Sequence, residues 1–130
     1  MTTQRVWSGS PWEPIVGFCR AVRVGDRIWV AGTAPFAPDG SVACPGDPAG
    51  QAARCLEIIG EALAGLGAGL QHVVATRMYV TDMSRAPEVG EAHRRAFGSH
   101  PPAATLVQVA GLVHPSLMVE IEAEALVRDE

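Results

Sequence analysis

Residues 119–125 read VEIEAEA, an alternation of apolar side chains and carboxylates near the end of the chain. Successive side chains of an extended strand point to opposite faces of a sheet, so this segment predicts a half-buried strand. Its apolar residues would face the core, and Glu120, Glu122 and Glu124 would share the other face. Solvent, cationic partners or chemistry could each account for this row of carboxylates.

The first half of the chain predicts a hairpin followed by a helix. Short apolar runs at 18–24 and 27–31 flank Gly25–Asp26, a pair that tolerates the positive φ of a tight turn. Asp47–Pro48 is typical of a helix start, with Asp as the N-cap and Pro at the first helical position. Apolar residues then recur at helical spacing over 52–66, which indicates one buried stripe.

The second half predicts a strand over 73–80, a helix over 84–97 that begins at a capping Ser84, and strands over 104–110 and 117–126. The resulting order is ββ–α–β–α–ββ. Two helices are too few to cover both faces of the sheet, so we predict an α+β sandwich with a mixed sheet and both helices on one face. We expect a single domain spanning residues 1–130.

Composition excludes several classes of function. The chain has a net charge of −4 and no run of basic residues, which argues against a nucleic-acid partner. No stretch reaches the length of a membrane span, so we expect no membrane partner. The three cysteines and four histidines follow no ligand spacing, so we expect no metal site and no cofactor. These features are typical of a cytoplasmic protein with reduced thiols.

The sheet face opposite the helices is expected to be mixed in character. Alternation over 73–80 would place Arg77 and Tyr79 on the same face as the glutamates. A face of this kind suits a second subunit better than bulk water. Arg77 is the candidate ion-pair partner for Glu120 or Glu122, and Glu124, near the strand end, is expected to meet solvent.

The chain resembles the RidA family, also called YjgF or L-PSP, from about Gly17 to Val127. The matching segments are AVRVGDRIWVAGTAP (21–35), DPAGQAARCLEIIGEAL (47–63), VVATRMYVTDMSRAPEVGEAHRRAF (73–97), PPAAT (101–105) and VEIEAEA (119–125). The resemblance implies a chorismate-mutase-like fold, assembled as a homotrimer whose sheets form a central barrel with clefts between subunits. It also implies hydrolysis, without a cofactor, of imines and enamines that pyridoxal-phosphate enzymes form from amino acids.

The resemblance implies a site that this chain keeps only in part. Glu120 stands where the family has a carboxylate that positions or activates water, and the strand-end Gly32 is present. The family's substrate-binding arginine is replaced by Ala104, its tyrosine by Phe18 and its asparagine by Gly90. This chain is therefore expected to be a divergent member that lacks the family's carboxylate-binding arginine.

Further positions complete the expected substrate site. Leu106 stands at the family's cysteine position, and Thr33 and Thr105 flank the cleft, where they could donate hydrogen bonds or merely pack as strand-end residues. Arg77 could supply the missing cation or could pair with a structural glutamate. The expected substrate-binding residues are Phe18, Gly32, Thr33, Arg77, Ala104, Thr105 and Leu106, with Glu120 catalytic.

The lost polar groups favour a substrate that is bulkier or less acidic than the founding members accept. The first hypothesis is an enamine or imine deaminase-like hydrolase with altered specificity. The alternative is a ligand-binding or regulatory homotrimer of the same fold without catalysis. A holdase-like or ribonuclease-like role is a third possibility, which the acidic charge opposes.

Overall fold

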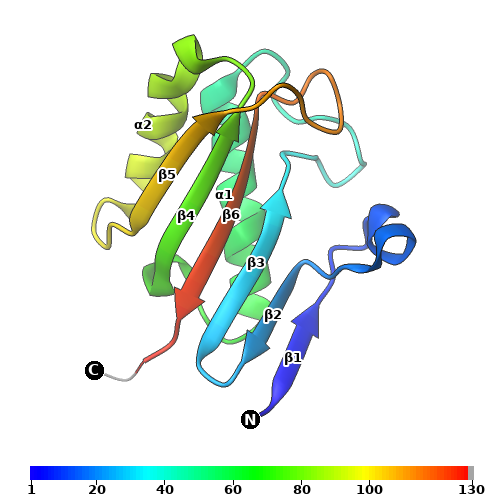
Figure 1. The fold of residues 1–130 in the computed structure, drawn as a ribbon, viewed down its shortest axis with the longest axis vertical. Helices are drawn as coiled ribbons and strands as arrows, with labels where there is room; N and C mark the ends of the chain where they lie inside the picture. Colours follow the sequence, from blue (N-terminus) through cyan, green and yellow to red (C-terminus); the bar gives the residue numbers. More distant parts are fainter. Residues whose placement is uncertain (129–130) are drawn as a thin grey trace.

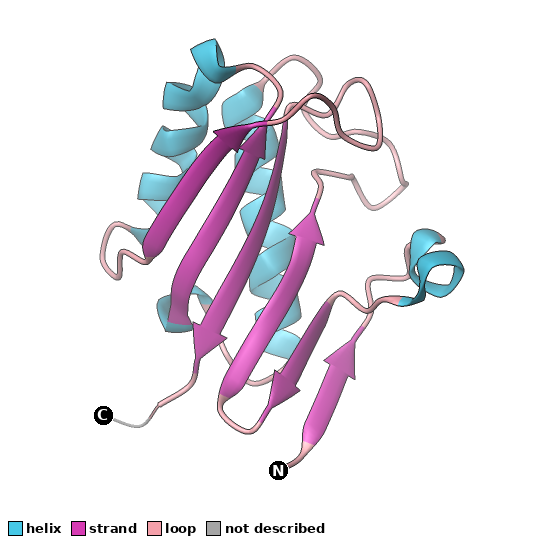
Figure 2. Ribbon diagram, viewed as in Figure 1, coloured by secondary structure: helices cyan, strands magenta, loops and turns pink. Residues whose placement is uncertain are grey.

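The computed structural model describes residues 1–128 and consists of a six-stranded sheet with two helices packed on one face (Figures 1 and 2). The expected domain of residues 1–130 ends two residues beyond this described part. The strands are β1 (Thr3–Val6), β2 (Ala21–Val24), β3 (Arg27–Thr33), β4 (Val73–Val80), β5 (Ala103–Gln108) and β6 (Val119–Leu126). The helices are α1 (Pro48–Gly65) and α2 (Ala86–Phe97), with short turns η1 (Glu13–Gly17), η2 (Leu70–His72) and η3 (Met83–Arg85).

The sheet is mixed, and its strand order is β1-β2-β3-β6-β4-β5. β4 and β5 are parallel, whereas the remaining neighbours are antiparallel. β6, the last strand in the sequence, lies near the middle of the sheet between β3 and β4. The predicted α+β class, with a mixed sheet and both helices on one face, is confirmed.

The apolar side of β6 forms the centre of the core. Val119, Ile121, Ala123 and Ala125 are each at most 3% exposed, and β6 packs against α1. The glutamates between them are only partly buried, on the face away from the helices. The alternation read from the sequence therefore predicts both faces of this strand correctly.

Helix α1 begins and ends where local chemistry favours it. The Asp47 carboxylate accepts a hydrogen bond from the Gly50 N–H at 3.0 Å, and Pro48 occupies the first helical position. Beyond the last turn, Gly67 has a φ of +77°, a conformation that glycine adopts without strain. Arg23 donates to the carbonyl of Leu66 at 2.7 Å.

Two local predictions were wrong. Ser84 does not cap α2, because it lies in the turn η3, where its N–H and hydroxyl both donate to the Asp82 carboxylate; the helix begins at Ala86. Strict alternation over 73–80, with Arg77 and Tyr79 on the glutamate face, would place Val74 toward the helices, but it is 49% exposed. A register shift between Val73 and Ala75 turns Val73 into the core instead, as a β-bulge does.

The N-terminal segment adds two elements that were not expected. β1 pairs with β2 in antiparallel register, from Thr3 opposite Val24 to Val6 opposite Ala21. The turn η1 follows and leads back into β2 (Figure 1). Within the described residues, no helix combines the length and apolar character that crossing a membrane would require.

Candidate functional site

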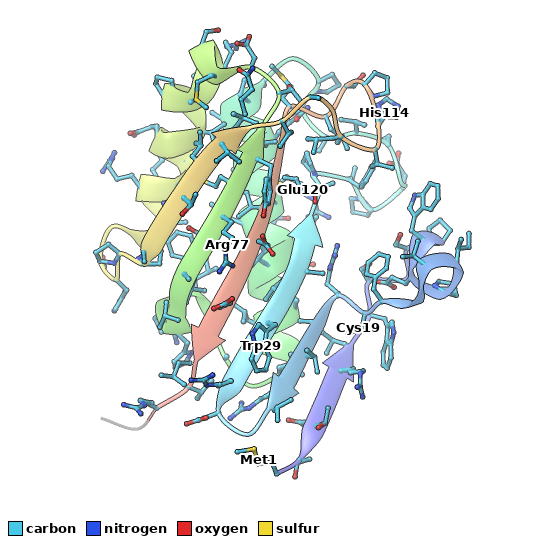
Figure 3. The ribbon with its side chains drawn as sticks, in the orientation of Figure 1. Met1, Cys19, Trp29, Arg77, His114 and Glu120 are labelled. Atoms are coloured by element: carbon cyan, nitrogen blue, oxygen red, sulfur yellow. The ribbon has the colours of Figure 1, made fainter. Side chains whose placement is uncertain are left out.

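The free face of the sheet, the face turned away from α1 and α2, carries the row of glutamates. In Figure 3, Glu120, Arg77 and Trp29 project from this face toward the viewer. In the ladder between β4 and β6, Glu120 lies opposite Tyr79 and Glu122 lies opposite Arg77. Side chains directly opposite each other in a sheet share a face, so charged and aromatic groups of both strands meet here.

Glu122 and Glu124 have partners on β4. Arg77 donates through both terminal nitrogens to Glu124 Oε1, at 3.3 Å each, and the Tyr79 hydroxyl donates to Glu122. The expectation that Arg77 pairs with Glu120 or Glu122, and that Glu124 meets only solvent, was therefore wrong. The long arginine side chain reaches diagonally along the strand. The hydrogen bond to Glu122, together with burial, raises the pKa of Tyr79.

Glu120 lies against the backbone of β3. A Cβ added at Gly32 would overlap its Oε2 atom, so this position accommodates the carboxylate only because residue 32 is glycine. The ladder between β3 and β6 is irregular here, with a register shift between Val30 and Thr33. Burial raises the pKa of Glu120. The charge of Arg20 lowers this pKa, and the negative charge of Glu122 raises it further.

Arg20 lies beside the same glycine. Its Nη2 donates to the Gly32 carbonyl at 2.8 Å, and its guanidinium carbon lies 5.7 Å from the centroid of the Phe18 ring. Its Nε is buried and has no hydrogen-bond partner in the described part of the chain. Burial lowers the pKa of Arg20, against the charges of Glu13 and Glu120. Leaving such a buried donor unpaired costs about 1–3 kcal/mol, so this atom requires an explanation.

Glu13 fixes the N-terminal segment next to Arg20. It is 3% exposed, and its carboxylate accepts hydrogen bonds from the Ser8 N–H at 3.0 Å, the Ser8 hydroxyl at 2.8 Å and the Gly9 N–H at 3.1 Å. Burial acts to raise the pKa of Glu13, but these hydrogen bonds and the charge of Arg20 together lower it. Glu13 is thus a satisfied, structural carboxylate.

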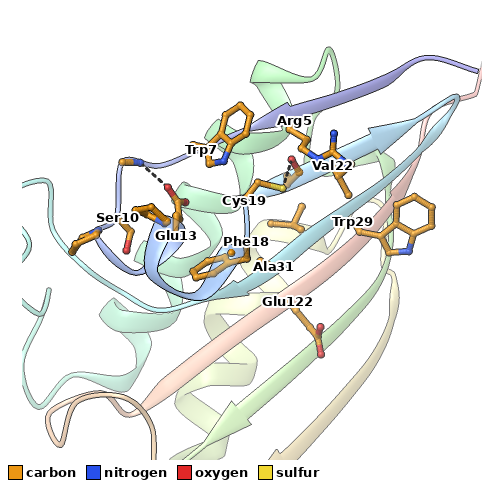
Figure 4. Close-up of a pocket in the computed structure, with 16 residues that line it drawn as sticks. Arg5, Trp7, Ser10, Glu13, Phe18, Cys19, Val22, Trp29, Ala31 and Glu122 are labelled. Carbon is orange, nitrogen blue, oxygen red and sulfur yellow. Dashed lines mark hydrogen bonds between the residues drawn. The ribbon is translucent and has the colours of Figure 1, made fainter.

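A groove of about 860 Å³ opens between the N-terminal segment and the free face (Figure 4). Its walls are largely apolar and include the rings of Trp7, Phe18 and Trp29, with Glu122 at one side. Trp7 is 63% exposed and Trp29 is 39% exposed. Exposed aromatic rings around a hollow suit an apolar ligand group or the surface of another subunit.

The structure brings together three of the residues predicted for the site. The Arg20 guanidinium lies over the Phe18 ring and donates to the Gly32 carbonyl, and the Glu120 carboxylate lies against Gly32. Thr33 is next in sequence but is fully buried, and its hydroxyl donates to the Ala31 carbonyl at 2.8 Å. Its side chain is therefore already engaged in packing and local hydrogen bonding.

The remaining predicted residues lie away from Glu120. Ala104, Thr105 and Leu106 belong to the edge strand β5, which β4 separates from β6. Thr105 is in register with Arg77 on the free face. Ala104 and Leu106 are in register with residues of β4 that face the helices. Gly90 lies on α2. Within one chain, the predicted site is thus split between the central strands β3 and β6 and the edge strand β5.

Sequence reasoning missed Arg20 and Glu13. A signal for Arg20 was present, because it stands two residues after Phe18, and residues at this spacing in an extended segment share a face. Glu13 gave no such signal, since its burial depends on how the loop of residues 8–17 folds back. Residues 1–128 contain no group of three or more His, Cys, Asp or Glu side chains placed to hold a metal ion.

Comparison with known proteins gives consistent results. The model of the family described as Endoribonuclease L-PSP matches residues 9–127. The crystal structure of Rv2704 from Mycobacterium tuberculosis, described as a member of the YjgF/YER057c/UK114 family, is 45% identical with a TM-score of 0.88, covering 97% of this chain and all of that one. Protein SCO2049 of Streptomyces coelicolor is 40% identical over 94% of this chain and 90% of its own. The 3-aminoacrylate deaminase RutC of Acinetobacter baylyi is 29% identical over 90% of this chain and 91% of its own.

Proposed function

The chain belongs to the Endoribonuclease L-PSP family, the RidA or YjgF family that the sequence resembles, and on this premise we propose that it hydrolyses imines or enamines with Glu120 as the catalytic carboxylate. The observation that carries the proposal is the placement of Glu120 against Gly32, partly buried and with a raised pKa. A carboxyl group whose pKa rises toward neutrality is a better proton acceptor near neutral pH than an exposed glutamate.

The proposed reaction needs only water and one proton-transferring group. The Glu120 carboxylate accepts a proton from a water molecule as the water oxygen bonds to the imine carbon, and the C=N electron pair moves to nitrogen. The protonated Glu120 then returns the proton to the nitrogen, which gives the neutral carbinolamine. Glu120 next accepts the carbinolamine hydroxyl proton and passes it to the nitrogen as the C–N bond breaks and the C=O bond forms, so that ammonia leaves and Glu120 is again a carboxylate. One water is consumed, and no electron acceptor is required.

We place the complete cleft between subunits of a homotrimer. This placement is supported by the split of the predicted residues between Glu120 on β6 and the β5 edge strand, since a second copy could bring its β5 to the first copy's Glu120. It is also supported by exposed apolar side chains on the free face, Trp29 at 39% and Val107 at 41%. One relative is named a 3-aminoacrylate deaminase. We propose the same class of reaction here, with a different substrate.

Altered specificity is supported by the residues that replace the family's polar groups. Ala104 offers no cation, Phe18 offers no hydroxyl, and the adjoining groove has apolar walls. The same groove would also suit a ligand-binding trimer without catalysis, which is the second candidate function. RNA hydrolysis is not proposed, because the chain carries a net charge of −4 and no basic run to bind phosphates.

The test is imine hydrolysis, with imino acids generated in situ by an amino-acid oxidase over side chains from small aliphatic to aromatic. Wild type is compared with Glu120→Gln, and Glu124→Gln is the matched control from the same strand face. All three proteins are first checked for equal assembly. We expect Glu120→Gln to lose about 100-fold or more in turnover, and Glu124→Gln to stay near wild type.

Two results would contradict the proposal. Equal turnover by wild type and Glu120→Gln would remove Glu120 from the chemistry. If wild type does not exceed buffer with any substrate of the panel, the ligand-binding function becomes the better account, and the groove lined by Trp7, Phe18 and Trp29 is the place to search for the ligand.

A further inference from the structure

We infer that Arg20 binds the carboxylate of an α-imino acid substrate and so takes over the role of the arginine that Ala104 replaces. The inference rests on the proposed function and specifies its substrate class. It follows from three properties of the Arg20 guanidinium: a fixed orientation, an unused donor and the absence of a contacting ion-pair partner.

The orientation of Arg20 is fixed from two sides. Its Nη2 is bound to the Gly32 carbonyl at 2.8 Å, and the Phe18 ring lies 5.7 Å from its guanidinium carbon. A planar guanidinium held in this way presents its remaining N–H groups in a fixed geometry, which matches the two oxygens of a carboxylate. A long arginine side chain in solvent would lose rotamer freedom on binding an anion, whereas this one is already ordered.

Arg20 has donor capacity that the described chain does not use. A guanidinium has five N–H groups, and the buried Nε–H has no partner in residues 1–128. Arg77, the cation expected from the sequence, differs in this respect. Both of its terminal nitrogens are bound to Glu124. Between these two arginines, only Arg20 has a terminal nitrogen, Nη1, without an acceptor in the described residues, and this nitrogen is the donor that a ligand carboxylate would reach.

Arg20 likewise has no ion-pair partner in contact. Arg54, Arg77, Arg85, Arg94 and Arg95 each form an ion pair, but none of the ion pairs in the described residues includes Arg20. The charges of Glu13 and Glu120 act on Arg20 only from a distance, and the Glu13 carboxylate is occupied by Ser8 and Gly9. A partly buried cation without a contacting anion is unfavourable, and the carboxylate of a ligand would complete the pair.

The position of Arg20 relative to Glu120 fits an α-imino acid. Arg20 contacts the carbonyl of Gly32, and the missing side chain of the same glycine makes room for the Glu120 carboxylate. In an α-imino acid the carboxylate is one bond from the imine carbon. A substrate held by Arg20 would therefore present that carbon to Glu120. Its side chain would extend along the Phe18 ring into the apolar groove, which favours large aliphatic or aromatic groups.

The experiment measures binding without turnover. The probe is 4-methyl-2-oxopentanoate, the keto acid that hydrolysis of a leucine-derived imine would release, and its uncharged methyl ester is the comparison ligand. Both are titrated calorimetrically into wild type, Arg20→Met and the matched control Arg77→Met. We expect Arg20→Met to weaken binding of the keto acid by about 30-fold or more. The ester should bind weakly to all three proteins, and Arg77→Met should bind the keto acid as wild type does.

The inference is overturned if wild type binds acid and ester equally, because that result would show no carboxylate recognition at all. It is also overturned if Arg20→Met retains full affinity for the acid. Should Arg20→Met fail to assemble, Arg20→Gln replaces it, since glutamine keeps an N–H for the Gly32 carbonyl but carries no charge.

Failure of the proposed hydrolysis is distinguishable from failure of this inference. Arg20-dependent binding of the keto acid, without any imine hydrolysis by wild type, would leave the binding role intact and remove the catalytic proposal. Glu120-dependent hydrolysis, with keto acid affinity that is independent of Arg20, would do the reverse.

Discussion

Two arginine–glutamate couples lie on the free face of the same sheet, and they differ in every physical respect. Arg77 and Glu124 touch at 3.3 Å, with side chains 43% and 38% exposed. Arg20 and Glu120 form no such ion pair, the Arg20 Nε is buried without a partner, and burial raises the pKa of Glu120. An exposed pair of this kind contributes about 0–1 kcal/mol to stability. In the partly buried couple neither group is paired with the other, and we propose that both serve a ligand.

Among the substitutions considered, Gly32→Ala is expected to have the largest effect on the Arg20–Glu120 couple. The added Cβ would overlap the Glu120 carboxylate and displace it, so we expect about a 100-fold loss of imine hydrolysis but little change in the free energy of unfolding, because the overlapped atom is the end of a flexible side chain. Gly90→Ala is the matched control, because a Cβ there meets nothing within 4 Å and the residue lies in α2. That control should gain up to about 1 kcal/mol. Wild-type turnover by Gly32→Ala would show that the close approach of residue 32 and Glu120 is unimportant.

Glu13→Gln tests the support behind Arg20. The amide loses charge-assisted hydrogen bonds from Ser8 and Gly9, and we expect a loss of about 1.5–3 kcal/mol at neutral pH in urea denaturation at fixed protein concentration. The folded-state pKa of Glu13 is lowered from 4.5, so its contribution is present above that value and disappears as pH falls through the folded-state pKa. The gap between wild type and variant should therefore close in acid. A gap independent of pH would assign the effect to packing alone.

The contribution of Glu120 to the free energy of unfolding should depend on pH in the opposite way to that of Glu13. The folded-state pKa of Glu120 lies above 4.5, so between that value and the raised one the folded state binds more protons than the unfolded state. Its contribution to stability is full below 4.5 and is lost as pH rises through the folded-state pKa. Wild type should lose stability relative to Glu120→Gln across this window, to a smaller extent than the Glu13 effect. Parallel stability curves for the two proteins would contradict the raised pKa.

The exposed couple should show the smallest effect. We expect Arg77→Met and Glu124→Gln each to change the free energy of unfolding by less than about 1 kcal/mol, and the difference from wild type to shrink in high salt. Thermal denaturation at low and high salt measures this directly. A large effect that is insensitive to salt would show that the Arg77–Glu124 contact is as important to the fold as the Arg20 site.

The elements predicted correctly are those with strong local patterns. The start of α1 follows from Asp47–Pro48, and both faces of β6 follow from strict alternation. β1 was missed because three of its four residues are exposed, so no alternation marks it as a strand. Ser84 was misread because Asp82 caps the preceding turn η3 and accepts hydrogen bonds from both the Ser84 N–H and the Ser84 hydroxyl.

The candidate site was only partly predictable, for a different reason. Glu120, Gly32 and Phe18 were identified through resemblance to a family, position by position. The partners of the glutamates depend on strand register, which a sequence does not reveal, and so Arg77 was assigned to the wrong glutamates. The spacing from Phe18 was the one sequence signal for Arg20, and its contact with the Gly32 carbonyl depends on how β2 and β3 come together in space.

The most direct test of the difference between the two couples is a crystal structure of the protein with 4-methyl-2-oxopentanoate bound. We expect the ligand carboxylate to lie on Arg20, with a hydrogen bond from its Nη1, which has no acceptor in the described residues, and the keto carbon to face Glu120. A carboxylate bound instead to Arg77, with Glu124 displaced, would contradict our account.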